Sequence, residues 1–226
     1  MNDRLRSAFD NEPVPNDLEA RLRARLDQTP QGAGISRWWL VAACLAMLAI
    51  AIGISQHAAQ KKITALLGIG VSDHVHCAVA GVYPHQTRRV EMIDGLGPQF
   101  APMLEPVVER ASAGRPKPDA VESAHRCTVN GRAYVHIILR RDGMLISVIL
   151  TRRSDTETFP LVTAARILHA SGNASGIPLH DASLDGYSVS GFESGAWLGY
   201  VVSGFPVRQN DALAARVAPV VRGYAR

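Results

Sequence analysis

The sequence lacks the short motifs that mark common catalytic sites. It contains no phosphate-binding glycine loop, no HExxH pair and no EF-hand loop. The run Gly186–Gly191, GYSVSG, is one residue too long for the G-x-S-x-G turn that presents a catalytic serine. The acidic residues are scattered, so the sequence places no pair of carboxylates face to face. We therefore expect no enzymatic activity.

A concentrated patch of basic charge is also missing. Lysine and arginine number 24 against 20 aspartate and glutamate, which gives a net charge of +4. Residues 1–37 hold six arginines and six acidic residues, so the excess falls in residues 38–226, where it is spread thinly. Affinity for phosphates needs a dense basic surface. We expect no direct contact with nucleic acid.

Long apolar runs are absent with one exception. Residues 38–54 read WWLVAACLAMLAIAIGI, seventeen residues without a charge. This length is at the short end of what crosses a hydrocarbon core of about 30 Å, and Trp38 and Trp39 suit the headgroup level at one end. A secretory signal begins near the N-terminus, whereas here 37 residues come first. The run predicts a single transmembrane helix over residues 37–58.

Basic residues beside the apolar run predict its orientation. Two lysines follow it, Lys61 and Lys62, and four arginines precede it: Arg21, Arg23, Arg25 and Arg37. This excess places the N-terminus in the cytoplasm, and we expect a single-pass protein of a bacterial inner membrane with the lipid bilayer as its partner. The chain would then divide into a cytoplasmic amphipathic segment (1–36), the transmembrane helix (37–58), a juxtamembrane linker (59–69) and an extracytoplasmic domain (70–226).

The cytoplasmic segment contains one leucine stripe. Leu18, Leu22 and Leu26 recur every four residues, which lines one face of a helix, and Arg21 and Arg25 stand beside that face. A helix this short needs a surface to lie on. Two surfaces remain open from the sequence: anionic lipid headgroups or a cytoplasmic protein partner.

Turn signals in the remaining chain predict an antiparallel β-meander. Asn130-Gly131 and Asp142-Gly143 are both strong two-residue hairpin turns. They separate three β-type runs, residues 121–129, 133–140 and 144–152. A second hairpin is expected from residues 186–192 and 196–205, and residues 73–82 are a further β-type run.

Helical patterns accompany these strands. Helices are expected at residues 98–112 and 208–224, the second of which has an apolar stripe with helical spacing, while residues 155–180 are ambiguous. Strands with helices segregated around them give an α+β fold, with flanking helices beside the meander.

Cysteine is scarce, at three residues, and two of them have histidine neighbours. Cys44 lies in the apolar run. Cys77 follows His74 and His76, Cys127 follows His125, and His136 lies on the next expected strand. Thiolate and imidazole ligands together suit zinc or copper.

Strand geometry separates two uses of these residues. On regular strands a single-faced metal site would use His74, His76, His125 and Cys127 and leave Cys77 out. A disulfide between Cys77 and Cys127, common in oxidising compartments, would instead require these two residues to share a face. The sequence leaves three alternatives open: a disulfide, a metal or redox-sensing site, and two unrelated buried thiols.

The arrangement of parts resembles the membrane-bound anti-sigma factors of bacteria. The resemblance covers the apolar run and most of residues 70–226, and it rests on the segments DHVHCAV, LGPQFAPMLEPVVERA, AHRC, GRAYVHIILRR and FESGAWLGYVVSGFPVRQNDALAARVAPVVR. It implies a protein that holds a sigma factor at the membrane and responds to an outer signal. The H-x3-C-x2-C motif of many such factors is missing, because residues 1–37 contain neither histidine nor cysteine.

Two functional hypotheses follow from these observations. The first is a membrane regulator of the anti-sigma type, whose outer domain senses or docks something and whose N-terminal helix contacts a cytoplasmic partner. The second is a membrane-tethered periplasmic domain that binds a metal or an envelope protein and has no sigma-factor role.

Overall fold

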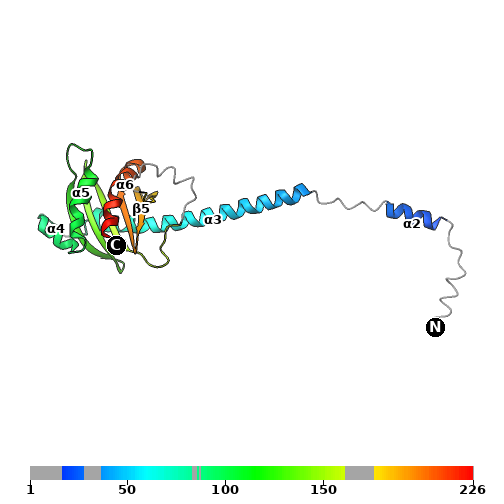
Figure 1. Cartoon of the computed structure of the whole chain (residues 1–226), viewed down its shortest axis with the longest axis horizontal. Helices are drawn as coiled ribbons and strands as arrows, with labels where there is room; N and C mark the ends of the chain where they lie inside the picture. Colours follow the sequence, from blue (N-terminus) through cyan, green and yellow to red (C-terminus); the bar gives the residue numbers. More distant parts are fainter. Residues whose placement is uncertain (1–16, 28–36, 83–85, 87, 161–175, 226) are drawn as a thin grey trace, which may run out of the picture. The chain divides into compact units, whose positions relative to one another are not determined.

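The computed structural model describes residues 17–27, 37–82, 86, 88–160 and 176–225 (Figure 1). The chain forms two compact units, Met1–Ile54 and Ser55–Arg226. In the first unit, helix α2 (Leu18–Asp27) is the expected short leucine helix. Ion pairs between residues four apart lie along it, Arg21 with Asp17 at 3.7 Å and Arg23 with Glu19 at 2.9 Å.

Helix α3 (Arg37–Asp73) contains the one segment, among the described residues, that is long and apolar enough to cross a membrane. At 1.5 Å per residue its 37 residues extend about 55 Å, well beyond a hydrocarbon core of about 30 Å. Only its first half is therefore needed for a span. Residues 59–69, which were expected to form a juxtamembrane linker, continue the helix.

The second half of α3 belongs to the core of the second unit. Ile63, Leu66, Leu67 and Val71 are 5% exposed or less. Their spacing of three and four residues puts them on one helix face. A short π-helix, η1 (His74–Val79), follows directly and buries His74, Cys77 and Ala78 on the same side. The predicted β-strand at 73–82 is therefore wrong, because residues 74–79 are helical and their buried side chains continue the helical spacing of α3.

Six strands form one antiparallel sheet in the order β1-β2-β3-β6-β5-β4. Their bounds are β1 (Ala120–Val129), β2 (Arg132–Arg141), β3 (Met144–Arg152), β4 (His180–Leu184), β5 (Tyr187–Ser194) and β6 (Trp197–Ser203). The fold of this unit is α+β. Asn130 and Gly131 both have positive φ, 53° and 77°, as a type I′ hairpin turn requires.

The sheet carries a different layer on each face. One face packs against α4 (Arg89–Leu96), η2 (Ala101–Met103), α5 (Leu104–Ser112) and α6 (Val207–Tyr224). Of these, α4, α5 and α6 are labelled beside the sheet in Figure 1. The second half of α3 and η1 cover the opposite face. Helices were expected at 98–112 and 208–224, and both are confirmed. Of the ambiguous region 155–180, residues 161–175 lie outside the described part of the chain.

Strand alternation assigns each side chain to a layer. On β2, Val135, Ile137 and Leu139 face the layer of α4, α5 and α6, whereas Tyr134 faces α3. His136 has the same parity as Tyr134 and so also faces α3. On β1, Ala124 faces away from α3 and Cys127 faces toward it.

Candidate metal centre

Two neighbouring strands bring together the side chains of the candidate site. In the β1–β2 register His125 lies directly opposite His136, and their ring centroids are 5.5 Å apart. Cys127 stands two residues after His125, on the same face of β1. Opposite Cys127 lies Tyr134, whose burial raises its pKa to about 12. The hairpin thus presents two imidazoles and a thiol to the layer of α3.

The helix layer supplies the other half of the site. Asp73, the last residue of α3, and Cys77 of η1 are one turn apart and fully buried. The sulfur of Cys77 lies 3.4 Å from that of Cys127. The thiols of Cys77 and Cys127 contact the same carboxylate oxygen, Asp73 Oδ1, at 3.6 Å and 3.5 Å. Both cysteines are free thiols in this structure.

Four side chains form a compact donor cluster, which we call the Cys/His cluster: Cys77, His125, Cys127 and His136. One ligand atom from each lies within 4.8 Å of the others. Ligands around a tetrahedral zinc ion, with Zn–S of about 2.3 Å and Zn–N of about 2.0 Å, stand about 3.3 to 3.8 Å apart. The cluster therefore needs only small side-chain adjustments to surround an ion.

Asp73 fixes one imidazole of the cluster. Its Oδ2 lies 3.0 Å from His136 Nδ1, and both side chains are 0% exposed. Burial lowers the pKa of His136, but contacts with Asp73 and Cys77 outweigh it, so the pKa of this imidazole is raised. By geometry neither nitrogen of this ring makes a hydrogen bond to a described residue: Nδ1 has only the 3.0 Å contact with Asp73, and Nε2 has no polar partner. His136 Nε2 is therefore a buried nitrogen with an unused lone pair or proton in the cluster.

A second polar contact fixes the other imidazole. His125 Nδ1 lies 2.9 Å from Ser123 Oγ. The Ser123 hydroxyl also donates to Gln86 Oε1 at 3.0 Å, and the same oxygen accepts from the backbone N–H of Ala124 at 2.8 Å. The ring of His125 is thereby oriented by its Nδ1 side.

The two thiols and the Asp73 carboxylate influence each other's protonation. The pKa of Cys127 is raised, first by the hydrogen bond that it shares with Cys77, then by burial and by the charge of Asp73. Two thiolates and a carboxylate in one buried site would carry three negative charges, which is costly without a cation. The same hydrogen bond lowers the pKa of Cys77, so the metal-free pair keeps its proton on Cys127.

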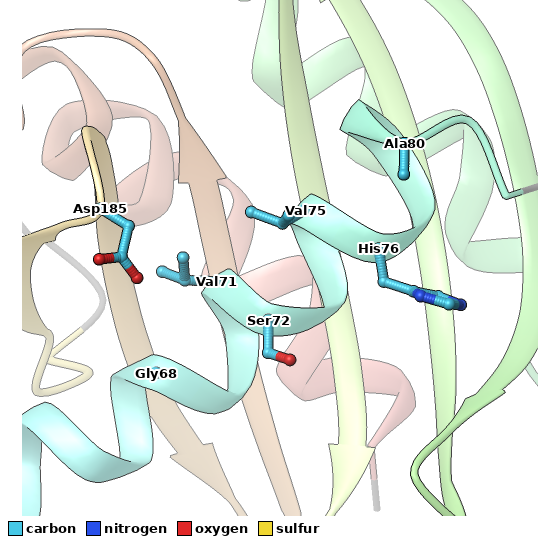
Figure 2. Close-up of a pocket in the computed structure, with 7 residues that line it drawn as sticks. All are labelled: Gly68, Val71, Ser72, Val75, His76, Ala80 and Asp185. Atoms are coloured by element: carbon cyan, nitrogen blue, oxygen red, sulfur yellow. The ribbon is translucent and has the colours of Figure 1, made fainter.

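Two histidines that the sequence grouped with this site lie elsewhere. His74 Nδ1 is 2.6 Å from Ser147 Oγ, and the ring packs edge-on against Tyr187. His76 is exposed and lines an open hollow between the end of α3, η1 and the turn at Asp185 (Figure 2). Of the four predicted metal ligands, the structure thus brings together His125 and Cys127. It adds Cys77, which was expected only as part of a disulfide or redox pair with Cys127, and His136.

The pairing of His125 with His136 could have been read from the sequence. A two-residue turn at Asn130-Gly131 pairs residue 129 with 132, and continuing outward pairs 125 with 136. The involvement of Asp73 had no comparable signal.

The predicted partner-binding residues lie on α2, in the other unit. Leu18, Leu22 and Leu26 are 40%, 54% and 72% exposed, and Arg21 and Arg25 belong to the same helix.

No family model, curated protein or solved structure matches this chain.

Proposed function

We propose that this protein is a membrane-anchored metal-binding protein whose C-terminal domain holds one zinc ion in the Cys/His cluster. The observation that carries the proposal is the convergence of two thiols and two imidazoles within 4.8 Å of one another, three of the four residues buried. The apolar part of α3 provides the anchor.

The donor set favours zinc. Two sulfurs and two nitrogens in a tetrahedral arrangement are typical of zinc, with copper(I) the next candidate because thiolates also select it. Four protein ligands leave no open position for a water molecule, which is the arrangement of a structural or sensing site. This agrees with the absence of catalytic motifs in the sequence.

The contacts behind the ligands suit such a site. His136 Nδ1 faces Asp73 and His125 Nδ1 faces Ser123, so each ring would bind the ion through Nε2. Metal-binding histidines usually have a carboxylate or another polar partner on the second nitrogen, which sets the tautomer and the ring orientation. Asp73 and Ser123 would fill these two roles.

Binding of an ion would also attach the helix layer to the sheet. Cys77 comes from η1, directly after α3, while the other three ligands come from the β1–β2 hairpin. A site assembled from distant segments adds its binding energy to the folded state. Metal occupancy would therefore stabilise the packing of residues 63–79 on the sheet.

Topology follows the charges beside the span. We propose a single-pass protein of a bacterial inner membrane, with the N-terminal segment in the cytoplasm and residues 55–226 outside it. The basis is the excess of arginine before the apolar run over the two lysines after it.

Elemental analysis tests the metal proposal. The full chain, purified in detergent without chelators and then dialysed against trace zinc, should hold one zinc per chain. Cys77→Ser and His136→Ala should each lose it. His76→Ala is the matched control, since this exposed histidine belongs to the alternative ligand set, and it should keep one zinc. Zinc loss in His76→Ala with retention in Cys77→Ser would contradict the proposed ligands.

A second candidate function concerns α2. Its three leucines are exposed along one face, which fits a docking helix for a cytoplasmic protein, and in the anti-sigma resemblance that protein is a sigma factor. The two functions are compatible, since the metal site would then be the outer, sensing end of the regulator.

Affinity capture with the full chain in nanodiscs tests this second function. Leu22→Asp should lose a sigma factor that the unaltered chain retains, and Ala20→Asp, on the opposite side of α2, should keep it. Equal retention by both variants would remove α2 as the docking element.

A further inference from the structure

We propose that Cys77 and Cys127 also form a reversible disulfide, so that the site alternates between a metal-bound dithiolate and a metal-free disulfide. The inference rests on the proposed metal function for the first of these states. Its structural basis is the contact between the two sulfurs, 3.4 Å apart and 50 residues apart in sequence. A disulfide bond of about 2.05 Å needs the sulfurs to approach by little more than 1 Å.

The two states exclude each other because they use the same sulfur atoms. A cysteine that binds zinc must be a thiolate, whereas the sulfur atoms of a disulfide carry no negative charge and bind zinc poorly. Oxidation would leave only His125 and His136 of the four ligands. Two imidazoles alone do not make the closed tetrahedral site that holds zinc tightly.

The proposed oxidant is a disulfide compound, either a small molecule or a thiol–disulfide oxidoreductase. One cysteine thiolate attacks a sulfur of the oxidant, RSSR, forms a mixed disulfide and releases one RS⁻. The second thiolate attacks the protein sulfur of that mixed disulfide, forms the Cys77–Cys127 bond and releases the second RS⁻. Two electrons pass to the oxidant, and zinc leaves with its charge unchanged.

Exposure assigns the order of these two steps. Cys77 is 0% exposed, whereas Cys127 on β1 is half-buried. In the metal-bound form both sulfurs are already thiolates, so access decides which one reacts. Cys127 is then the thiol that meets the oxidant, and Cys77 is the thiol that resolves the mixed disulfide.

Both states keep the helix layer joined to the sheet. Zinc links η1 to the β1–β2 hairpin through four ligands, and the disulfide links the same η1 to the same β1 through a covalent bond. The switch therefore changes metal binding while the domain stays folded. Placement outside the cytoplasm would expose it to oxidising conditions.

Oxidation of the full zinc-loaded chain tests the inference. The chain carries Cys44→Ala, is held in detergent, and is treated with oxidised glutathione. Intact mass, free thiols and released zinc are followed together. We expect loss of two thiols per chain, a mass lower by two hydrogens and release of one zinc, all reversed by reductant with added zinc. Oxidation with zinc retained, or two separate glutathione adducts, would overturn the inference.

Single-cysteine variants test the order of steps. With oxidised glutathione and saturating zinc, which keeps the remaining sulfur a thiolate, Cys77→Ser should accumulate an adduct on Cys127, and Cys127→Ser should stay unmodified at Cys77. An adduct on Cys77 alone would overturn the assigned order. Circular dichroism checks that each variant is folded, and Ser147→Ala, which alters only the partner of His74, serves as the control and should behave as the unaltered chain.

The outcomes separate this inference from the metal function. Zinc uptake without disulfide formation overturns the inference and leaves the metal function standing. Disulfide formation in a chain that never takes up zinc overturns both the metal function and the proposed alternation, and it leaves only a structural disulfide.

Discussion

Replacement of Asp73 by asparagine tests how the buried carboxylate serves the Cys/His cluster. Asp73→Asn keeps the size and shape of the side chain and removes its charge. The affected contacts are the 3.0 Å pair with His136 and the contacts at 3.5 Å and 3.6 Å with the two sulfurs. The four proposed zinc ligands are themselves unchanged, so the variant isolates the support that Asp73 gives to them.

The expected loss is set by the position of Asp73 behind His136. Removing a partner of this kind usually lowers metal affinity about 10- to 100-fold, which corresponds to about 1.4 to 2.7 kcal/mol. Full burial of both groups places the effect toward the upper end, because solvent does not screen the pair. Loss of a ligand, as in Cys127→Ser, should cost more.

A competition titration measures this loss. The full chain in detergent competes for zinc with a chromophoric chelator under reducing conditions, and the dissociation constants of variant and unaltered chain are compared. Asp185→Asn is the matched control, because it makes the same substitution at an exposed carboxylate away from the cluster. Asp185 has a φ of 51°, which asparagine also adopts readily. Affinity of Asp73→Asn within twofold of this control would refute the role of Asp73.

Three further perturbations test the domain around the site. Zinc at 100 times its dissociation constant should stabilise the domain by about 2.7 kcal/mol and raise Tm by about 5 to 11 °C. An unchanged melting curve would contradict a zinc site that exists only in the folded domain. Gly70→Ala should lower the free energy of unfolding of the domain by about 1 to 3 kcal/mol in a denaturant titration, because the new Cβ would lie 2.6 Å from Tyr200 Cγ. A Cβ at Gly68, on the same helix, meets nothing within 4 Å, so Gly68→Ala should be neutral or stabilising. Equal stability of the two variants would mean that this half of α3 does not pack on the sheet. Hydrogen bonds from Arg132 lower the pKa of Glu157 from 4.5 to about 2, so its contribution to stability is present above pH 4.5 and lost as pH falls toward 2. Glu157→Gln should therefore flatten the stability–pH curve in that window, and an unchanged slope would contradict the contact.

Much of the sheet could be predicted from local signals. Asn130-Gly131 and Asp142-Gly143 are residues that accept positive φ, and each forms the turn its sequence indicates. The strand bounds beside them follow within one residue, and β3 (Met144–Arg152) agrees at both ends. The turn at Asp185-Gly186 was missed because strand β4 before it is short and only partly apolar.

The helix layer could not be predicted in the same way. Between Lys61 and Val79 no residue type marks the point where the membrane-spanning part of the helix ends and the part that packs in the protein core begins. DHVHCAV alternates well enough to suggest a strand, but packing against the sheet favours continuation of α3 with helical spacing. Local preference gave way here to burial of Val71, His74 and Cys77 on one side.

That difference decides the composition of the site. On a strand, Cys77 would face away from His74 and His76; on η1 it turns toward Cys127, His74 turns toward Ser147 and His76 lies exposed. The sequence therefore indicated residue types that could hold a metal ion, while the grouping of these residues depended on tertiary packing. His125 and Cys127 were placed correctly together because they lie on a true strand.

X-ray absorption at the zinc edge measures the proposed coordination most directly. On the full chain in detergent, reduced and loaded with one equivalent of zinc, we expect two sulfur ligands at about 2.3 Å and two nitrogen ligands at about 2.0 Å. Cys77→Ser should hold no zinc after the same loading and dialysis, and His76→Ala should leave the spectrum unchanged. A shell of nitrogen and oxygen only, or a single sulfur in the unaltered chain, would contradict a zinc site built from Cys77, His125, Cys127 and His136.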